Sequence, residues 1–189
     1  MGFLDDTYEY EYTGQDKEGS YVYTFDSIEK NTVTKIIRIN HWVNISEYGG
    51  NWHNIGFSNK DKLAVNNVKD FQKVIATVFV CAVEFLKLNP DSKILFFGDA
   101  PHKQYWYKRG VGNNIEGLKD FLNVRGGVLT VKVPLKLEKQ MVMKRGELVE
   151  REMEIKDLEA VIDIAKIKCL EEYNKENKND YDFILIEIK

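Results

Sequence analysis

The sequence predicts an α+β fold: an antiparallel meander of about four strands packed on a long buried helix, followed by further strands and helices in one sheet–helix domain. In the first third of the chain, aromatic residues recur at every second position, as in half-buried strands. From residue 68 to residue 88 the apolar positions follow helical spacing instead. The sequence shows no internal repeat and no linker, so we expect a single domain over residues 1–189.

Four short strands account for the first third. The segments YEYEY (8–12) and YVYTF (21–25) place a ring at every second position, and turn residues lie between them. A third run (32–43) puts alternate apolar residues on one face, and WHNIGF (52–57) follows a glycine pair. Short strands joined by turns usually pair as neighbours, which predicts the meander.

The long helix is predicted over residues 68–88. Asn67 is the expected N-cap, with Asp70 three residues later as in a capping box, and an Asn-Pro dipeptide ends the helix. Its middle is apolar on nearly every side, so we expect it to be buried against the sheet. The apolar run KILFFG (93–98) is typical of a strand covered on both faces.

The second half of the chain is predicted to alternate between helices and strands. Asp99 and Pro101 suit the start of a helix. We expect a helix over 101–110 and a second short helix over 111–122, followed by a strand over 127–139 with Pro134 at an edge or bulge. A charged hairpin tip or loop should follow over 144–154. The chain should then form a helix over 157–176, with Cys169 and Tyr173 on its apolar stripe, and a closing strand over 181–189.

Composition excludes several classes of protein. A net charge of −3 and a pI of about 5.7 give no overall positive field to hold nucleic acid or an anionic membrane. The first residues lack the features of a signal peptide, and the longest apolar run (74–83) is half a membrane span. Cys81 and Cys169 lie among apolar residues, as core thiols do in reduced proteins. We therefore predict a cytoplasmic protein without a cofactor.

The stretch INHWVNISEYGGNWHNI (39–55) nearly mirrors itself. If a turn is centred on Glu47, His41 faces His53 and Trp42 faces Trp52 across a hairpin. Two imidazoles on one face could share a metal ion, but zinc needs three or four ligands and no third one follows at a recognisable spacing. We therefore predict aromatic cross-strand packing and no metal site.

The same hairpin supplies a candidate interaction surface. Trp42, Tyr48 and Trp52, with the N-terminal tyrosines, could form an exposed aromatic platform for a base, a peptide or a partner protein. In the alternative, one face of the hairpin packs on the helix at 68–88. The alternative is favoured, because buried aromatic residues usually belong to a core.

The best local hypothesis for a ligand site is the segment HKQYWYKRG. On a helix, His102, Trp106 and Arg109 share one row, and Lys103 and Tyr107 form the next. Basic and aromatic side chains interleaved in this way can hold a phosphate and stack a base.

Two observations count against this site, and one alternative to it stays open. The preceding GDAP lacks the glycines and the lysine of a phosphate-binding loop, and Asp99 would compete with an anion at the helix start. The segment could therefore be an amphipathic helix with Tyr105 and Trp106 packed inward and its cations in solvent. No motif for a catalytic nucleophile appears, so no reaction is indicated.

The order of these features resembles a family of small uncharacterised bacterial α+β proteins. The resemblance rests on KVIATVFVCAVEFLKLNP, KILFFGDAP, YWYKRGV and YDFILIEI, and it covers most of residues 20–122 plus the C-terminal strand. The family's Arg-Thr-Arg-Leu-Tyr run is replaced here, with Lys103 or Gln104 at its first arginine, and the segment 125–156 is longer. The resemblance implies a fold type, and it draws attention to Lys103, Tyr107 and Arg109.

These observations favour a small cytoplasmic bacterial binding or interaction module. It would hold a protein partner, a second copy of itself or a small anionic ligand, and by analogy it would be one component of a toxin–antitoxin or defence pair. The alternative is an enzyme that acts on a nucleotide or RNA phosphate through the helix at 101–110, with His102 as acid or base.

Overall fold

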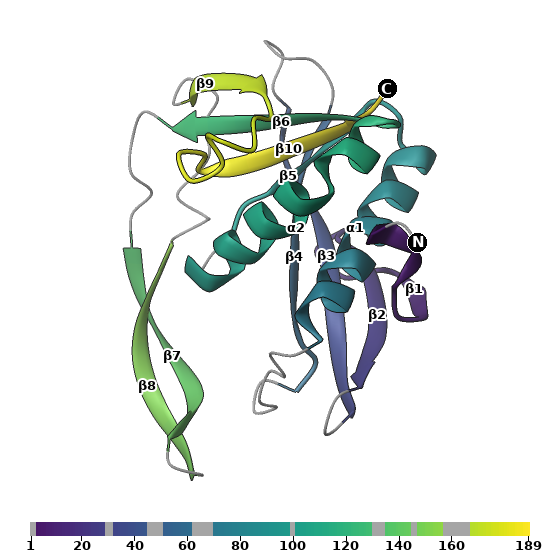
Figure 1. The fold of residues 1–189 in the computed structure, drawn as a ribbon. Helices are drawn as coiled ribbons and strands as arrows, with labels where there is room; N and C mark the ends of the chain where they lie inside the picture. Colours follow the sequence, from purple (N-terminus) through teal and green to yellow (C-terminus); the bar gives the residue numbers. More distant parts are fainter. Residues whose placement is uncertain are drawn as a thin grey trace.

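The computed structural model describes residues 3–28, 32–44, 51–61, 70–98, 101–129, 135–144, 147–156 and 167–189. These residues form an eight-stranded sheet with two helices on one face, and a two-stranded hairpin that lies apart from the sheet (Figure 1). In chain order the elements are η1 (Phe3–Asp5), β1 (Tyr10–Gln15), β2 (Tyr21–Ile28), β3 (Thr32–Asn44), β4 (Asn51–Asn59), α1 (Phe71–Leu88), β5 (Ser92–Phe96), α2 (Pro101–Lys119), β6 (Leu122–Leu129), β7 (Leu135–Lys144), β8 (Glu147–Lys156), β9 (Ile167–Glu172) and β10 (Phe183–Ile188).

The large sheet has the strand order β1-β2-β3-β4-β5-β10-β6-β9. Its first four strands are consecutive and antiparallel, which confirms the predicted meander. Strands β4 and β5 are parallel, and α1 is the helix that connects them. A parallel pair needs such a crossover because the chain must return to the same end of the sheet. The α+β class is therefore confirmed.

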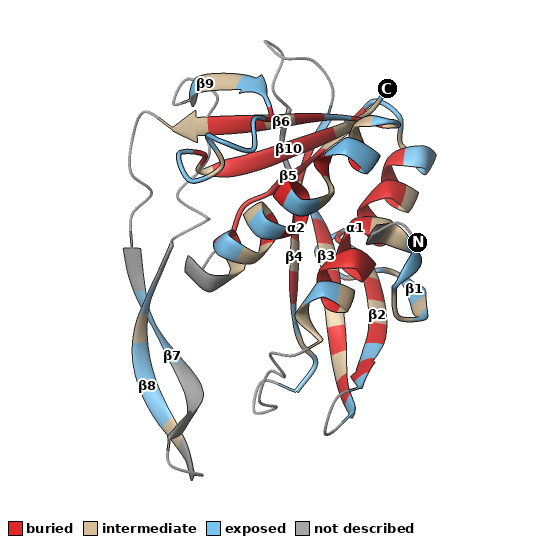
Figure 2. Ribbon diagram, in the orientation of Figure 1, coloured by how far each residue is buried: buried red, intermediate tan, exposed pale blue. Residues whose placement is uncertain are grey.

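Helix α1 is the centre of the main core, as its apolar sequence predicts. Most of its side chains are buried against the sheet (Figure 2). Phe79 stacks on Phe96 of β5 with 4.2 Å between ring centroids. The helix begins at Phe71 rather than at residue 68, and Asp70 takes the capping position, where its backbone carbonyl accepts a bond from Val74. The predicted cap, Asn67, lies outside the described residues.

Strands β5 and β10 are covered on both faces, which confirms the prediction for residues 93–98. One set of side chains faces the helices and belongs to the main core: Ile94, Phe96, Ile184 and Ile186. The other set forms a second cluster on the far face of the sheet: Trp52, Leu95, Phe97, Phe183 and Leu185. Burial on both faces explains why residues 94–97 and 183–186 form unbroken apolar runs.

Two glycines in β6 make room for aromatic rings. A Cβ atom on Gly126 would collide with the ring of Tyr181, and one on Gly127 would collide with the ring of Phe183. Gly127 lies directly opposite Phe183 on the neighbouring strand. The Gly-Gly pair is thus required by packing across strands, since even a methyl group would displace a buried ring.

Several predictions for the second half are wrong. Helix α2 is one unbroken helix over Pro101–Lys119, where two short helices were predicted over 101–110 and 111–122, and Leu122 already begins β6. The strand predicted over 127–139 is two strands in different sheets, β6 and β7, and Pro134 between them lies outside the described residues. The charged stretch predicted as a hairpin tip or loop over 144–154 does belong to a hairpin, β7–β8, but most of it is strand β8.

The helix predicted over 157–176 is also wrong where the structure describes it. Residues 167–172 form the edge strand β9, paired with β6, and residues 157–166 lie outside the described part. Pairing with the open edge of β6 satisfies backbone groups that a helix would leave unpaired on that strand, and this outweighs the helical spacing. Cys169 is accordingly only half-buried, whereas Cys81 in α1 is buried as predicted. No helix in the described residues is both long and apolar enough to cross a membrane.

Candidate functional site

Helix α2 carries the five residues predicted to bind a ligand, but it places them in different environments, from the core to the exposed surface. Tyr107 is 1% exposed and packs edge-on against Phe57 and Phe96, with centroid distances of 6.2 and 5.2 Å. The prediction that Tyr107 faces a ligand is therefore corrected, because it is a core residue. Arg109 is exposed and lies 3.4 Å from the hydroxyl of Tyr105. The side chain of His102 lies outside the described residues.

Trp106 is half-buried on the side of α2 that faces α1, and Lys103, one turn earlier, is also half-buried. The Trp106 ring lies 5.2 Å from the Phe71 ring and stacks on Phe57 at 6.4 Å. The inward packing predicted for Trp106 by the amphipathic-helix alternative is confirmed. The same alternative is wrong for Tyr105, which is 56% exposed.

Gln104 holds the start of α2 in place, a role that no local sequence pattern indicates. Its side-chain oxygen accepts a bond from the N–H of Gly98 (2.7 Å), and its amide donates to the carbonyl of Asp182 (2.7 Å). A side chain at Gly98 would collide with the backbone of Gln104. Gly98 at the end of an apolar strand was the available signal, since such a glycine often marks close approach of two backbone segments.

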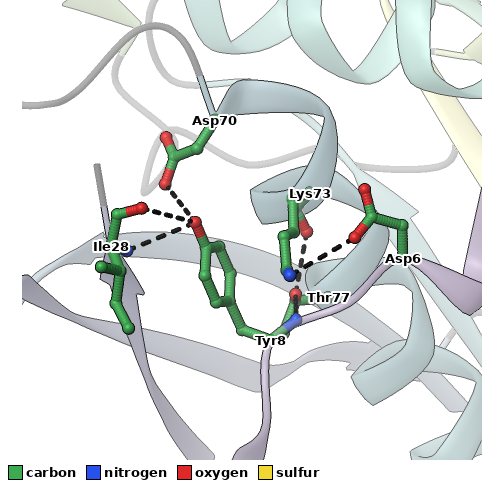
Figure 3. A network of polar contacts seen from close by, with 6 residues as sticks. All are labelled: Asp6, Tyr8, Ile28, Asp70, Lys73 and Thr77. Carbon is green, nitrogen blue, oxygen red and sulfur yellow. Dashed lines mark hydrogen bonds and ion pairs between the residues drawn. The ribbon is translucent and has the colours of Figure 1, made fainter.

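A polar cluster lies at the start of α1, beyond the predicted site. Asp70 Oδ2 accepts hydrogen bonds from the hydroxyl of Tyr8 (2.8 Å, Figure 3) and from the hydroxyl of Ser27. Ser27 is fully buried, and Asp70 Oδ1 is buried without a hydrogen-bond partner. The pKa of Tyr8 is raised, chiefly by burial and further by its bond to Asp70. We call Tyr8, Ser27, Lys35, Asn59 and Asp70 the Asp70 cluster.

Lys35 brings a buried amine into the Asp70 cluster. It is 2% exposed, and its Nζ donates to Asn59 Oδ1 at 2.7 Å. Burial lowers the pKa of this amine, while the charge of Asp70 raises it and the charge of Lys103 lowers it further. Of the predicted ligand residues, Lys103 therefore acts electrostatically on this cluster.

The N-terminal segment is tied to α1 next to this cluster. The backbone N–H of Tyr8 donates to Thr77 Oγ1 (2.9 Å), and Lys73 pairs with Asp6 at 3.3 Å (Figure 3). The Lys73 amine also lies 4.7 Å from the centre of the Tyr8 ring. These contacts fix the Tyr8 ring, and so its hydroxyl, in front of Asp70.

Of the two cross-strand pairs predicted in the mirrored stretch at 39–55, the structure contains one. His41 faces His53, as predicted, with ring centroids 5.3 Å apart. A bulge between His41 and Val43 then puts Val43 opposite Trp52, so the predicted pairing of Trp42 with Trp52 is wrong. An extra residue in one strand shifts all later pairs by one position. No three His, Cys, Asp or Glu side chains in the described part come together as metal ligands.

Trp52 is not part of a surface platform. It is fully buried in the far-face cluster with Leu95 and Phe97, so its assignment to an interaction surface is corrected. The physical reason is the register of β4, which points Trp52 at an apolar layer of β5 and β10. Tyr48 and the side chain of Trp42 lie outside the described residues.

His53 is a buried imidazole on the helix side of the same strand. It is 6% exposed, and its ring lies 4.8 Å from Phe85 of α1. Burial and the neighbouring His41 lower its pKa from 6.5 to about 4, against a smaller opposing effect of the Asn51 backbone. Its Nδ1 is buried without a hydrogen-bond partner. His53 is therefore neutral at pH 7, and its environment is that of a core residue.

The β7–β8 hairpin presents a different kind of surface. It makes no substantial contact with the other described elements and stands away from the sheet in Figure 1. Leu137 on β7 is 66% exposed. The register places it on one face with Lys139 and with three exposed acids of β8: Glu150, Glu152 and Glu154. Lys139 pairs with Glu150 at 3.2 Å, which leaves more negative than positive charge among these described side chains.

Comparison with known proteins assigns the chain to a family. A sequence profile described as a family of unknown function, DUF6934, matches residues 6–144. The chain belongs to the DUF6934 family. The match spans the meander, both helices and β7, which agrees with the predicted resemblance to an uncharacterised family. No curated protein and no solved structure matches the chain. Both helices, the Asp70 cluster and one strand of the projecting hairpin thus lie in the DUF6934 region.

Proposed function

We propose that this DUF6934 chain is a cytoplasmic protein-interaction module that binds its partner through the β7–β8 hairpin. The observation that carries the proposal is a hairpin with ten-residue strands that has no other described element packed on it. An isolated two-stranded hairpin is marginally stable in water, and its open edges readily accept another strand. Its exposed Leu137 offers apolar surface for burial in a complex.

The charge of β8 favours a different protein as the partner over a second copy. If two β8 edges paired antiparallel about a two-fold axis, each face of one strand would continue the same face of the other. Glu150, Glu152 and Glu154 share a face, so the acids of the two copies would meet. Like charges opposite each other destabilise a strand pair. A partner with Lys or Arg at alternate positions would match this row, as expected in a two-component bacterial toxin–antitoxin or defence pair.

The test removes the hairpin. Residues 135–156 are replaced by a short Gly-Ser linker, and the matched control carries Glu9, Glu11 and Glu18 changed to Gln on the opposite edge of the sheet. Because the hairpin has little contact with the body, the excised variant should keep its melting temperature within about 2–4 °C. Native mass spectrometry of protein taken from its own host should show a stoichiometric complex for the natural chain and the control. Retention of the complex after excision would refute the assignment.

A second candidate function is the binding of a small anionic ligand, such as a phosphate group, at the Asp70 cluster. It is favoured by the buried amine of Lys35 and the charge of Lys103 that acts on it. An enzyme acting on a nucleotide would extend the same site. Titration with inorganic phosphate and with AMP, followed by NMR, tests it. Saturable shifts at Lys35 that disappear in Lys103→Gln would support it, and unchanged spectra at millimolar ligand would exclude it.

A further inference from the structure

An apolar groove lies along the second half of α1. Its walls come from η1, α1, the turn between α2 and β6, and the end of β10. The apolar side chains that line it are Leu4, Val80, Val83, Phe121 and Ile188. Its volume is about 520 Å³. This lies within the range of small-molecule sites, about 300–1,000 Å³, and none of the described residues lines it with a hydroxyl or amide side chain.

Contacts between neighbouring elements hold the walls of the groove in place. Leu4 belongs to η1, which packs on α1 and is followed by the Lys73–Asp6 pair and the bond from Tyr8 to Thr77. On the other side, the N–H of Lys189 donates to the carbonyl of Phe121 at 3.3 Å, which joins the chain after β10 to the turn before β6. A groove between anchored elements is formed before a ligand arrives, so binding costs little rearrangement.

The charged side chains described at the groove are both cationic. Lys87 in the last turn of α1 and Lys189 after β10 line it, and no acidic side chain of the described residues does. The Lys189 amine donates to the carbonyl of Lys119. Lys87 is exposed and has no ion pair within the described part of the chain. An aliphatic cavity with cations at its edge is complementary to a molecule with an apolar chain and an anionic head.

We propose that this groove binds a single straight-chain fatty carboxylate, with its hydrocarbon chain between α1 and the end of β10 and its carboxylate at Lys87. The chain buries no polar group, which fits a lining of aliphatic and aromatic carbon. The head group remains near solvent, so its ion pair contributes modestly, while the chain supplies most of the affinity. This site is independent of the β7–β8 hairpin and of the Asp70 cluster.

The ligand class predicts how affinity depends on each part of the molecule. Each additional methylene that enters the groove should tighten binding about fourfold, until the groove is full. A surface ion pair is worth a factor of about 1.5 to 5, so decanoate should bind tighter than decanol by this factor. Decyltrimethylammonium should bind more weakly than decanol, because its charge has the same sign as that of Lys87.

The experiment measures binding of octanoate, decanoate, decanol and decyltrimethylammonium below their micelle concentrations, by isothermal titration calorimetry on the full chain. Val80→Glu places a charge in the groove at a half-buried helix position and should abolish binding of decanoate. Leu88→Glu is the matched control, because it adds the same charge nearby at a side chain that is 75% exposed and outside the groove. Lys87→Gln should weaken decanoate and leave decanol unchanged. Circular dichroism confirms that each variant is folded.

Each outcome decides the proposal. One-to-one binding of decanoate that is lost in Val80→Glu and kept in Leu88→Glu supports it. No saturable binding at millimolar decanoate overturns it, as does equal affinity for the cationic amphiphile. Binding that survives in Val80→Glu places the ligand elsewhere. Binding to phosphatidylglycerol vesicles without binding of free decanoate would assign the groove to a membrane surface and refute a fatty-acid site.

Discussion

The buried imidazole of His53 gives a quantitative prediction for stability against pH. In the folded protein its pKa is about 4, compared with 6.5 in the unfolded chain, because burial and His41 disfavour the charged form. Protonation would also add an N–H donor to this buried ring, whose Nδ1 has no hydrogen-bond partner. Below pH 6.5 the unfolded state therefore binds more protons than the folded state, and stability must fall as the pH falls.

The size of this effect follows from the two pKa values. Stability from His53 is complete above pH 6.5 and is lost progressively as the pH falls toward 4. Between pH 7 and pH 5 the loss amounts to about 2 kcal/mol, and over the whole window to about 3 kcal/mol. His53→Gln has no titrating imidazole, so its stability should fall by about 2 kcal/mol less than that of the natural protein over the same two pH units.

Urea unfolding at pH 7, 6 and 5 measures the difference, and an NMR titration of the imidazole protons measures the pKa of His53 directly. Groups that do not contact His53 titrate equally in both proteins, so they cancel when the two pH dependences are subtracted. His41→Gln is a useful second variant: removing its charge should raise the pKa of His53, though not to 6.5. Identical pH dependences for the natural protein and His53→Gln, or an imidazole that titrates near 6.5, would refute the reasoning.

Three further predictions concern packing and charge. Gly127→Ala should lower stability by about 1–3 kcal/mol, because its Cβ would collide with a buried ring. Gly117→Ala in α2 meets no atom and should raise stability by about 0.5–1 kcal/mol. Thermal unfolding that shifts the melting temperatures of both variants in the same direction would contradict this reasoning. Gln104→Leu should cost about 1–3 kcal/mol for each buried backbone group left unpaired, measured by urea unfolding against the natural chain. Asp70→Asn should lower the pKa of Lys35 further, because the carboxylate now raises it; an NMR titration showing no change would disprove their coupling.

Local sequence patterns correctly predicted those elements that pack against segments adjacent to them in the chain. The meander β1–β4 could be read because consecutive strands pair through short turns, and the alternation of residues fixes which side is buried. Helix α1 could be read because its apolar side chains cover nearly the whole circumference. The pairing of His41 with His53 followed from the symmetry of the hairpin around its turn.

The Asp70 cluster could not be predicted in this way. Its members Tyr8, Ser27, Lys35 and Asn59 come from an N-terminal segment and three strands, and Asp70 comes from a helix start. Nothing in the spacing of these residues indicates that they meet. The burial of Tyr107 was equally hidden, because a helical row shows which side chains share a face but does not show what that face contacts.

The sequence alone therefore determined the α+β class, the meander, the buried helix and the apolar strands at the centre of the sheet, because alternation and helical spacing are local consequences of backbone geometry. The tertiary structure decided the remainder. It made residues 167–172 a strand, since the open edge of β6 supplied hydrogen-bond partners; it shifted Trp52 away from Trp42 by one bulge; and it joined Asp70 to Tyr8 and Ser27 across the chain. Each of these depends on which distant segments lie side by side, and local sequence patterns carry no record of that.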